Sequence, residues 1–314
     1  MPFITVDDQK IHYRLTPAVP QPIPDDESDS GDDLSGEFDA ELLIFKTILF
    51  IPGLGATRSS YSDIIQRVSN KGHTCLSYDV PGSGQSTSNG RETSIETMCR
   101  VPLALLRHLG IRRVLIVAHS LGTLVACELA LHVEVWGIMM IAPLNPHPVT
   151  KEIMCIRQRI LARSGLEVLA DKVLSVTAEF ATDEQKKFLR TMMLSHTPEV
   201  YASLCQALYN ADRPRYPALN CPLTILRGSK DITCHADVCE DICDRWHLLA
   251  PKLVDTVPQI GHWPIVEAVG QVSNSIIGFV EMSELAMLRR HPQLLARIVG
   301  PSRRRRGKSA ATDA

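Results

Sequence analysis

The sequence predicts an α/β protein in which a mostly parallel sheet is flanked by helices and carries an inserted helical cap. Two observations predict this class. Between residues 42 and 146, and again after 216, short apolar runs rich in β-branched residues alternate with stretches of helical periodicity, as in parallel strands joined by crossovers. Between these regions, residues 147–215 contain helical periodicity and no strand candidate. Such a block between two strands of one sheet is expected to be a cap over the sheet.

Composition narrows the class of protein. The 314 residues are 45% hydrophobic and 22% charged, enough for the core of one large α/β domain or two small ones. A net charge of -2 argues against a nucleic-acid partner. No apolar run reaches the roughly 18 residues of a membrane span, and the first residues lack the pattern of a secretory signal. We therefore expect a cytoplasmic location, where the nine scattered cysteines are expected to be free thiols.

The chain opens with a predicted hairpin of strands 3–6 and 10–15. Residues 18–39 hold three prolines and a run of acidic residues, and they cannot bury enough apolar surface to offset the entropy of ordering. We expect a solvated loop insertion there, with an acidic patch for a partner as the alternative. Residues 42–51 then form an apolar strand that ends at Pro52-Gly53-Leu54-Gly55.

Strands and helices then alternate along the chain. The expected strands are 74–78, 112–118, 135–141, 222–227 and 252–257. The expected helices are 60–71, 93–109, 120–131, the four cap helices 152–164, 167–179, 183–195 and 198–208, and the final helices 236–249, 265–282 and 283–299. Between strand 74–78 and helix 93–109, Asp79 and Ser86 are expected to hold a Pro-Gly-x-Gly turn by local hydrogen bonds and to take no part in chemistry.

The most informative stretch is 114–126, where a buried strand stops at Ala118-His119-Ser120-Leu121-Gly122 and a helix follows at once. A serine between two small residues on a sharp strand-to-helix turn is typical of a nucleophile elbow. The usual first glycine of that motif is Ala118 here, which is small enough to be tolerated. The alternative is an ordinary turn with a capping serine.

A second turn rich in glycine predicts an anion-binding site facing this serine. Gly53 and Gly55 let the chain after the first apolar strand turn so that amide groups point outward. We assign the Leu54 amide, together with the Leu121 amide just after Ser120, as the donors of an oxyanion hole.

Two later loops supply a base and an acid for Ser120. A serine hydroxyl needs a neighbouring base, and that base needs an orienting acid. Asp231 and His262 each follow a later strand, in the chain order serine, acid, histidine, and the ends of parallel strands meet at one edge of a sheet. His119 and His235 are the competing bases. The side chain of His119 is expected to point away from the serine at so sharp a turn.

These motifs resemble those of the α/β-hydrolase superfamily, in its esterase- and lactonase-like branch. The segments that carry the resemblance are Gly53-Leu54-Gly55, residues 79–86, residues 118–122, Gly228-Ser229-Lys230-Asp231 and Gly261-His262. In the cap, residues 165–171, 198–202 and 207–212 are similar to 3-oxoadipate enol-lactonases. The acidic insertion and the chain after 283 lie outside the pattern.

The predicted function is that of a serine hydrolase acting on a small carboxylic ester or lactone through an acyl-enzyme. Ser120 is the predicted nucleophile, His262 the base and Asp231 the orienting acid, with Leu54 and Leu121 as oxyanion donors. Leucine, methionine and valine residues of 152–208 are expected to line the substrate pocket. Three alternative functions are compatible with the same fold and residues: a thioesterase, a carbon–carbon bond hydrolase, and a ligand receptor of low turnover.

The chain is thus divided into a core and a cap. The core is expected to comprise residues 1–146 and 216–299, the cap 147–215, and residues 300–314 a basic disordered tail. The alternative interpretation of the Arg303–Arg306 run in this tail is that it serves as a nuclear-import signal.

No cofactor is implied. His235, Cys239 and Cys243 are four residues apart, as on one face of a helix, so a zinc site is an alternative here. We nevertheless expect no metal.

Overall fold

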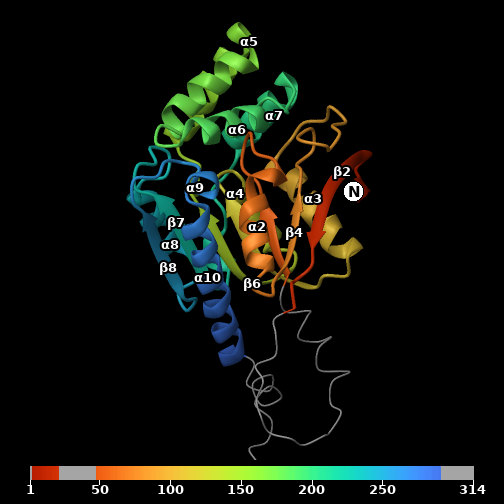
Figure 1. The fold of residues 1–314 in the computed structure, drawn as a ribbon, viewed down its shortest axis with the longest axis vertical. Helices are drawn as coiled ribbons and strands as arrows, with labels where there is room; N and C mark the ends of the chain where they lie inside the picture. Colours follow the sequence, from red (N-terminus) through yellow and green to blue (C-terminus); the bar gives the residue numbers. More distant parts are fainter. Residues whose placement is uncertain (1, 21–46, 291–314) are drawn as a thin grey trace, which may run out of the picture.

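The computed structural model describes residues 2–20 and 47–290. Its strands form one sheet, with helices on both faces and further helices over one end (Figure 1). The strands are β1 (Phe3–Val6), β2 (Gln9–Thr16), β3 (Thr47–Ile51), β4 (Thr74–Tyr78), β5 (Arg113–His119), β6 (Glu134–Ile141), β7 (Leu223–Gly228) and β8 (Lys252–Val257). Their order in the sheet is β1-β2-β4-β3-β5-β6-β7-β8.

The sheet is parallel except at its N-terminal edge. β1 and β2 form the predicted hairpin, and β2 pairs antiparallel with β4. From β4 across to β8 every neighbouring pair is parallel. β3 and β5 lie in the middle of the sheet, and all five residues of β3 are buried, as an apolar run covered on both faces requires. The chain segments that follow β3, β5, β7 and β8 therefore leave the sheet at the same edge.

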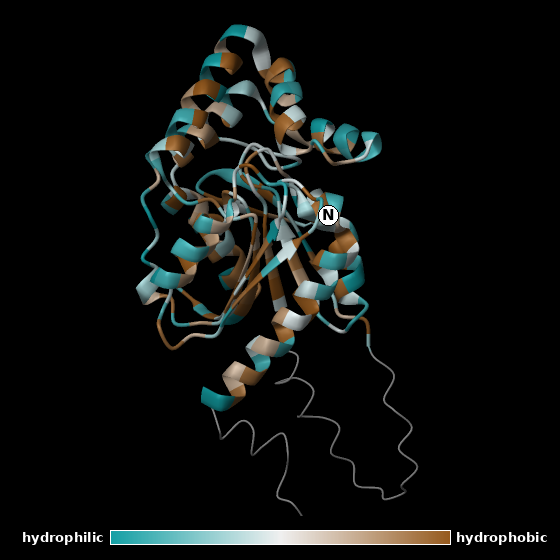
Figure 2. Ribbon diagram, turned by 90° about the vertical axis from the view of Figure 1, so that its left-hand side faces the viewer, coloured by the Kyte–Doolittle hydropathy of each residue, from teal (hydrophilic) through white to brown (hydrophobic). Residues whose placement is uncertain are grey.

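Helices cover both faces of the sheet. Those outside the cap are α2 (Ser62–Ser69), α3 (Ile95–His108), α4 (Gly122–Leu129), α8 (Ala236–Arg245), α9 (Pro264–Glu267) and α10 (Val269–Arg290), with 3-10 turns at Arg58–Tyr61 and Tyr216–Ala218. α2 packs with α10, and α3 packs with α4. Figure 2 shows hydrophobic strands at the centre of the molecule and hydrophilic residues on the outer faces of the helices. The core therefore lies between the sheet and these two layers.

The cap consists of α5 (Pro148–Thr177), α6 (Asp183–Met193) and α7 (Pro198–Asn210), which lie over one end of the sheet (Figure 1). The predicted all-helical insertion is thus confirmed. Two predicted helices, 152–164 and 167–179, are the halves of α5, which is interrupted at Gly165 with φ 79° and ψ 173°. α5 begins earlier than predicted because Pro148 occupies its first turn, where a missing amide hydrogen costs nothing.

Other element ends differ from the predictions. A boundary near residue 283 is wrong: α10 continues to Arg290, and Ser283 is buried within it. α8 ends at Arg245, four residues before the predicted end, and the helix after Ser120 begins at Gly122. Residues 21–39 of the acidic insertion, 42–46 of the first apolar strand, 291–299 of the last predicted helix and the tail 300–314 lie outside the described residues.

Within 2–20 and 47–290, no helix combines the length and apolar character needed to cross a membrane.

Candidate active site

Ser120 occupies the turn between β5 and α4. Its φ of 52° lies in the left-handed region, which costs a residue other than glycine about 1–3 kcal/mol and persists only where the surroundings enforce it. The Ser120 amide donates to the Ile141 carbonyl at 3.0 Å, which ties the turn to β6. Ala118 is fully buried in β5 and has no positive φ, so its methyl group meets no backbone constraint that glycine would be needed to relieve.

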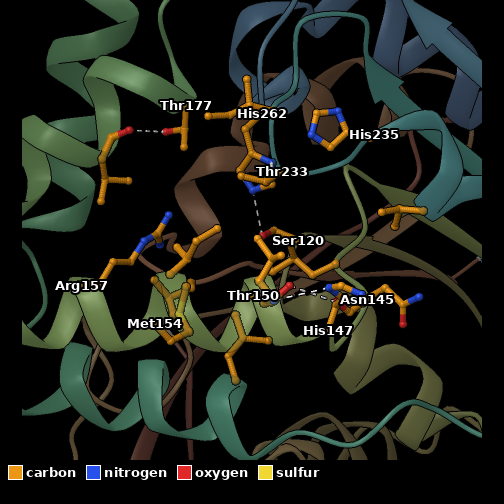
Figure 3. A pocket seen from close by; sticks show the side chains of 18 of the residues that line it. Ser120, Asn145, His147, Thr150, Met154, Arg157, Thr177, Thr233, His235 and His262 are labelled. Atoms are coloured by element: carbon orange, nitrogen blue, oxygen red, sulfur yellow. Dashed lines mark hydrogen bonds between the residues drawn. The ribbon is translucent and has the colours of Figure 1, made fainter.

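The structure brings Ser120, His262 and Asp231 together. His262 Nε2 lies 2.9 Å from Ser120 Oγ, and His262 Nδ1 lies 2.8 Å from Asp231 Oδ2. Figure 3 shows the first of these hydrogen bonds. Because the carboxylate can only accept, Nδ1 carries the proton and Nε2 is left to accept from the serine hydroxyl. All three residues are at most 6% exposed.

Asp231 is held in place by its own loop. Its Oδ1 accepts hydrogen bonds from the Thr233 amide at 2.8 Å, the Thr233 hydroxyl at 2.8 Å and the Cys234 amide at 3.2 Å. Burial raises the pKa of Asp231, but the charge of His262 and the hydrogen bonds from His262 and Thr233 outweigh burial and hold the pKa well below its usual value. The carboxylate is therefore ionised at neutral pH.

Thr233 belongs to this arrangement, although we did not predict it from the sequence. Its Oγ1 lies 2.7 Å from His262 Nδ1 while it donates to Asp231. The Nδ1 proton is thus shared between a carboxylate and a hydroxyl. An aspartate followed two residues later by threonine is a turn-forming pattern, so this signal was present in the sequence.

The loop that carries His262 is clamped on both sides. Glu267 accepts from the Gly261 amide at 3.1 Å and from the Trp263 amide at 2.9 Å. The His262 amide donates to the Thr177 carbonyl at 2.9 Å, at the end of α5. Burial raises the pKa of Glu267 above its usual value despite these hydrogen bonds. The position of the imidazole thus depends on one core carboxylate and on the cap.

His119 points away from Ser120, as predicted. Its Nε2 donates to the His262 carbonyl at 2.8 Å, and its ring packs against those of His262 and Trp263 with centroids 5.2 and 5.0 Å away. Burial, together with the nearby charge of His262, lowers the pKa of His119 to about 3. His119 therefore stays neutral and supports the His262 loop from behind.

Leu54 lines the same cavity as Ser120, and Leu121 directly follows Ser120 in the chain. Neither amide has a hydrogen-bond acceptor among the described residues. Gly53 makes this proximity feasible, because a Cβ there would lie 2.8 Å from His119 Nδ1 and 3.0 Å from Ser120 Cβ. Leu121 lies at the N-terminus of α4, where the helix dipole favours negative charge. Both amides thus keep a free donor, as an oxyanion hole needs, and their role as oxyanion donors stays a prediction.

The remaining sequence candidates lie elsewhere or play other parts. His235 is exposed and has no hydrogen bond to Ser120. The described residues contain no group of three or more potential metal ligands, so the zinc alternative has no support in them. Asp79 accepts from the Arg58 and Gln85 amides, and Ser86 donates to the Asp79 carbonyl, so both hold their turn as predicted.

A cavity of about 660 Å³ opens over Ser120 between the core and the cap. Met154, Val173 and Leu208 line it, as we predicted for apolar residues of 152–208. Two lining residues of the same stretch, Arg157 and Thr177, are polar and were not predicted. In the view of Figure 3, Arg157 and Met154 of α5 lie to the left of Ser120, and Asn145 and His147, just before the start of α5, lie to its right.

Comparison with known proteins shows which family this chain belongs to and which proteins it is similar to. A model of the alpha/beta hydrolase family matches residues 48–274, more than half of the chain. A 3-oxoadipate enol-lactonase of Acinetobacter baylyi is 27% identical over 217 residues, 66% of this chain and 79% of that protein. A protein of Pseudomonas savastanoi named for carbamate hydrolysis is 30% identical over 131 residues, 40% of this chain and 48% of that protein, so the match spans about half of that relative.

Solved structures share the fold. The enol-lactonase of Burkholderia xenovorans superposes with a TM-score of 0.73 at 20% identity, covering 89% of this chain and 100% of that one. A thermophilic esterase of Thermogutta terrifontis superposes with a TM-score of 0.71 at 18% identity, covering 88% and 94%.

Proposed function

Because the chain belongs to the alpha/beta hydrolase family, we propose that it is a serine hydrolase that cleaves a small carboxylic ester or lactone. One observation carries the proposal: the hydrogen-bonded series from Ser120 Oγ through His262 to Asp231, at 2.9 and 2.8 Å, beneath a cavity. The similarity to an enol-lactonase and the shared fold of an esterase support hydrolysis of a carboxylic ester bond.

In the proposed reaction, Ser120 Oγ attacks the substrate carbonyl while His262 Nε2 takes its proton. Asp231 orients the imidazole and stabilises the imidazolium that forms. The negative charge on the tetrahedral oxygen is stabilised by the Leu54 and Leu121 amides, and one such donor is typically worth about 10²–10³ in rate.

Collapse of this intermediate expels the alcohol, which receives the proton from His262, and leaves an acyl group on Ser120. Water then attacks the acyl group with His262 again as the base, releasing the acid and restoring the serine. For a lactone, the alcohol and acid remain parts of one product. No step of this sequence calls for a cofactor.

We further propose that residues 147–215 act as the substrate-selecting cap over a core of 1–146 and 216–299. The hydrogen bond from the His262 amide to the Thr177 carbonyl supports a direct link between the cap and the catalytic loop. The cavity volume of about 660 Å³ suits a small-molecule substrate.

Replacement of Ser120 tests the proposal. Ser120→Ala is expected to lower the kcat for short acyl nitrophenyl esters by at least about 10⁴-fold, because the nucleophile is lost. Ser175→Ala, which removes an exposed hydroxyl on α5, is the matched control and should leave kcat unchanged.

A fluorophosphonate probe, read by peptide mapping, should label Ser120 and no other residue. The proposal fails if Ser120→Ala keeps its turnover, or if an ester and lactone panel shows no hydrolysis while a thioester or a diketone is cleaved.

A further inference from the structure

One face of α5 lines the cavity, and it carries a single charge. Ile153 and Met154 each lie three or four residues from both Thr150 and Arg157, so the four residues form one stripe along the helix. The other charged residues nearby on α5, such as Arg159, are outside the lining. A cation among apolar residues of such a stripe costs solvation energy, so its presence calls for an explanation.

The Arg157 guanidinium has no anionic partner among the described residues. Its one hydrogen bond is a long one, from Nη1 to the Tyr201 hydroxyl at 3.4 Å. Tyr201 is fully buried, and burial raises its pKa to about 12, so this phenol brings no negative charge. Most of the five donor positions of the guanidinium remain free.

The second arginine of the cavity differs. Arg213 lies 3.8 Å from the carboxylate of Asp241, which also binds Arg245 at 2.7 Å and the Asn145 amide at 2.7 Å. Neither Asp241 nor Asp237, the two carboxylates of the lining, forms an ion pair with Arg157. Of the two arginines that line the cavity, Arg157 is therefore the one without an ion pair among the described residues.

We propose that Arg157 binds a carboxylate of the substrate, so that the enzyme acts on acidic esters or lactones: half-esters of dicarboxylic acids, or lactones with a carboxylate side chain. This inference rests on the proposed function of Ser120. A guanidinium presents two parallel N–H donors that match the two oxygens of a carboxylate, and apolar walls strengthen the attraction. With the carboxylate at α5 and the ester carbonyl at Ser120, one molecule spans the cavity. Arg157 is then a residue that determines specificity.

The test compares two substrates on each variant. The first is a mono-(4-nitrophenyl) ester of succinic, glutaric or adipic acid. The second is the same compound with its free carboxylate methylated, which is neutral and nearly the same size. The ratio of their kcat/KM values on one preparation does not depend on the fraction of folded enzyme.

We expect the wild type to prefer the acid form by about tenfold or more at its best chain length. Arg157→Gln should lower kcat/KM for the acid form by about 10- to 100-fold, the value of a lost charged hydrogen-bond pair, and leave the methyl ester within about threefold. Arg157→Lys keeps the positive charge but loses the paired N–H donors of the guanidinium. Its kcat/KM for the acid form should therefore lie between the values of the wild type and of Arg157→Gln. Arg159→Gln, an exposed neighbour on the same helix, should leave the ratio unchanged.

A binding experiment separates this inference from the proposed function. In Ser120→Ala, calorimetry should detect the free dicarboxylate, and adding Arg157→Gln should weaken that binding at least tenfold. If this holds while no ester is hydrolysed, the hydrolase proposal fails and the carboxylate site stands. If esters are hydrolysed through Ser120 but Arg157→Gln lowers both substrates equally, or the wild type shows no preference for the acid form, the carboxylate site is refuted.

Discussion

The two walls of the cavity are built differently. On the wall made by the strand ends, Asp231 Oδ1 alone accepts three hydrogen bonds, and the His262 loop is held by Glu267 and by the Thr177 carbonyl. On the α5 wall, the polar group of Arg157 makes one hydrogen bond of 3.4 Å. Groups that transfer protons need a fixed geometry, which saturated hydrogen bonding supplies, whereas groups that bind a ligand must keep donors free. The difference separates reaction chemistry from substrate choice.

The largest expected effect comes from the strand-end wall. Asp231→Asn should lower kcat for the best ester by about 10³–10⁴-fold, because the amide no longer enforces the tautomer with the proton on Nδ1. Steady-state kinetics measure it. Asp237→Asn removes a carboxylate from the same cavity without touching His262, and it should leave kcat within threefold. Equal losses in both variants would mean that charge, and not orientation, is what Asp231 supplies.

Gly53→Ala should lower kcat by about 10²-fold. The added Cβ would lie within 3.0 Å of His119 Nδ1, the His119 carbonyl and Ser120 Cβ, so the Leu54 amide must move, and one displaced oxyanion donor has an effect of this size. Gly270→Ala, where a Cβ meets nothing within 4 Å, is the control. An unchanged kcat in Gly53→Ala would remove Leu54 from the oxyanion hole.

On the α5 wall, changes should act on binding. Met154→Ala should raise KM for an ester substrate by up to about tenfold and leave kcat within threefold, because it removes apolar contact from the cavity and leaves His262 in place. Ile156→Ala, on the exposed side of the same helix, should change neither value. A fall in kcat as large as that in Gly53→Ala would show that the two walls are not separable.

The smallest effect on turnover is expected at His119, where acid stability is the better measure. Its pKa is about 3 in the folded protein against 6.5 ordinarily, so between these values the unfolded chain binds more protons. This contribution to stability is complete above pH 6.5 and is lost as the pH falls toward 3, by at most about 1.4 kcal/mol per pH unit. His119→Gln lacks it. Its unfolding free energy, measured in urea from pH 6.5 to 4, should fall less steeply than that of the wild type, and parallel curves would contradict the assignment.

Much of the fold and of the strand-end wall was predictable from local signals. The alternation of apolar strands and helices predicted the parallel sheet, and the all-helical stretch predicted the cap. The turn at Ser120 was readable because a buried strand, a serine and a small residue follow within a few positions. Element ends were less predictable: α10 continues through Ser283, which is buried against Gly137 of β6, and no local pattern announces that distant contact.

The sequence by itself thus determined which residue types stand at the ends of the strands, because strand periodicity and tight turns are local properties of the chain. Only the tertiary structure decided that Thr233 shares the His262 proton, that Thr177 of the cap holds the His262 loop, and that Arg157 faces the cavity without a counter-charge. These are contacts between segments distant in sequence or choices of helix face. The Thr233 contact depends on the pairing of β7 with β8, which brings the loops after these strands together. The other two depend on how α5 packs over the sheet, which is set by the summed packing of many side chains.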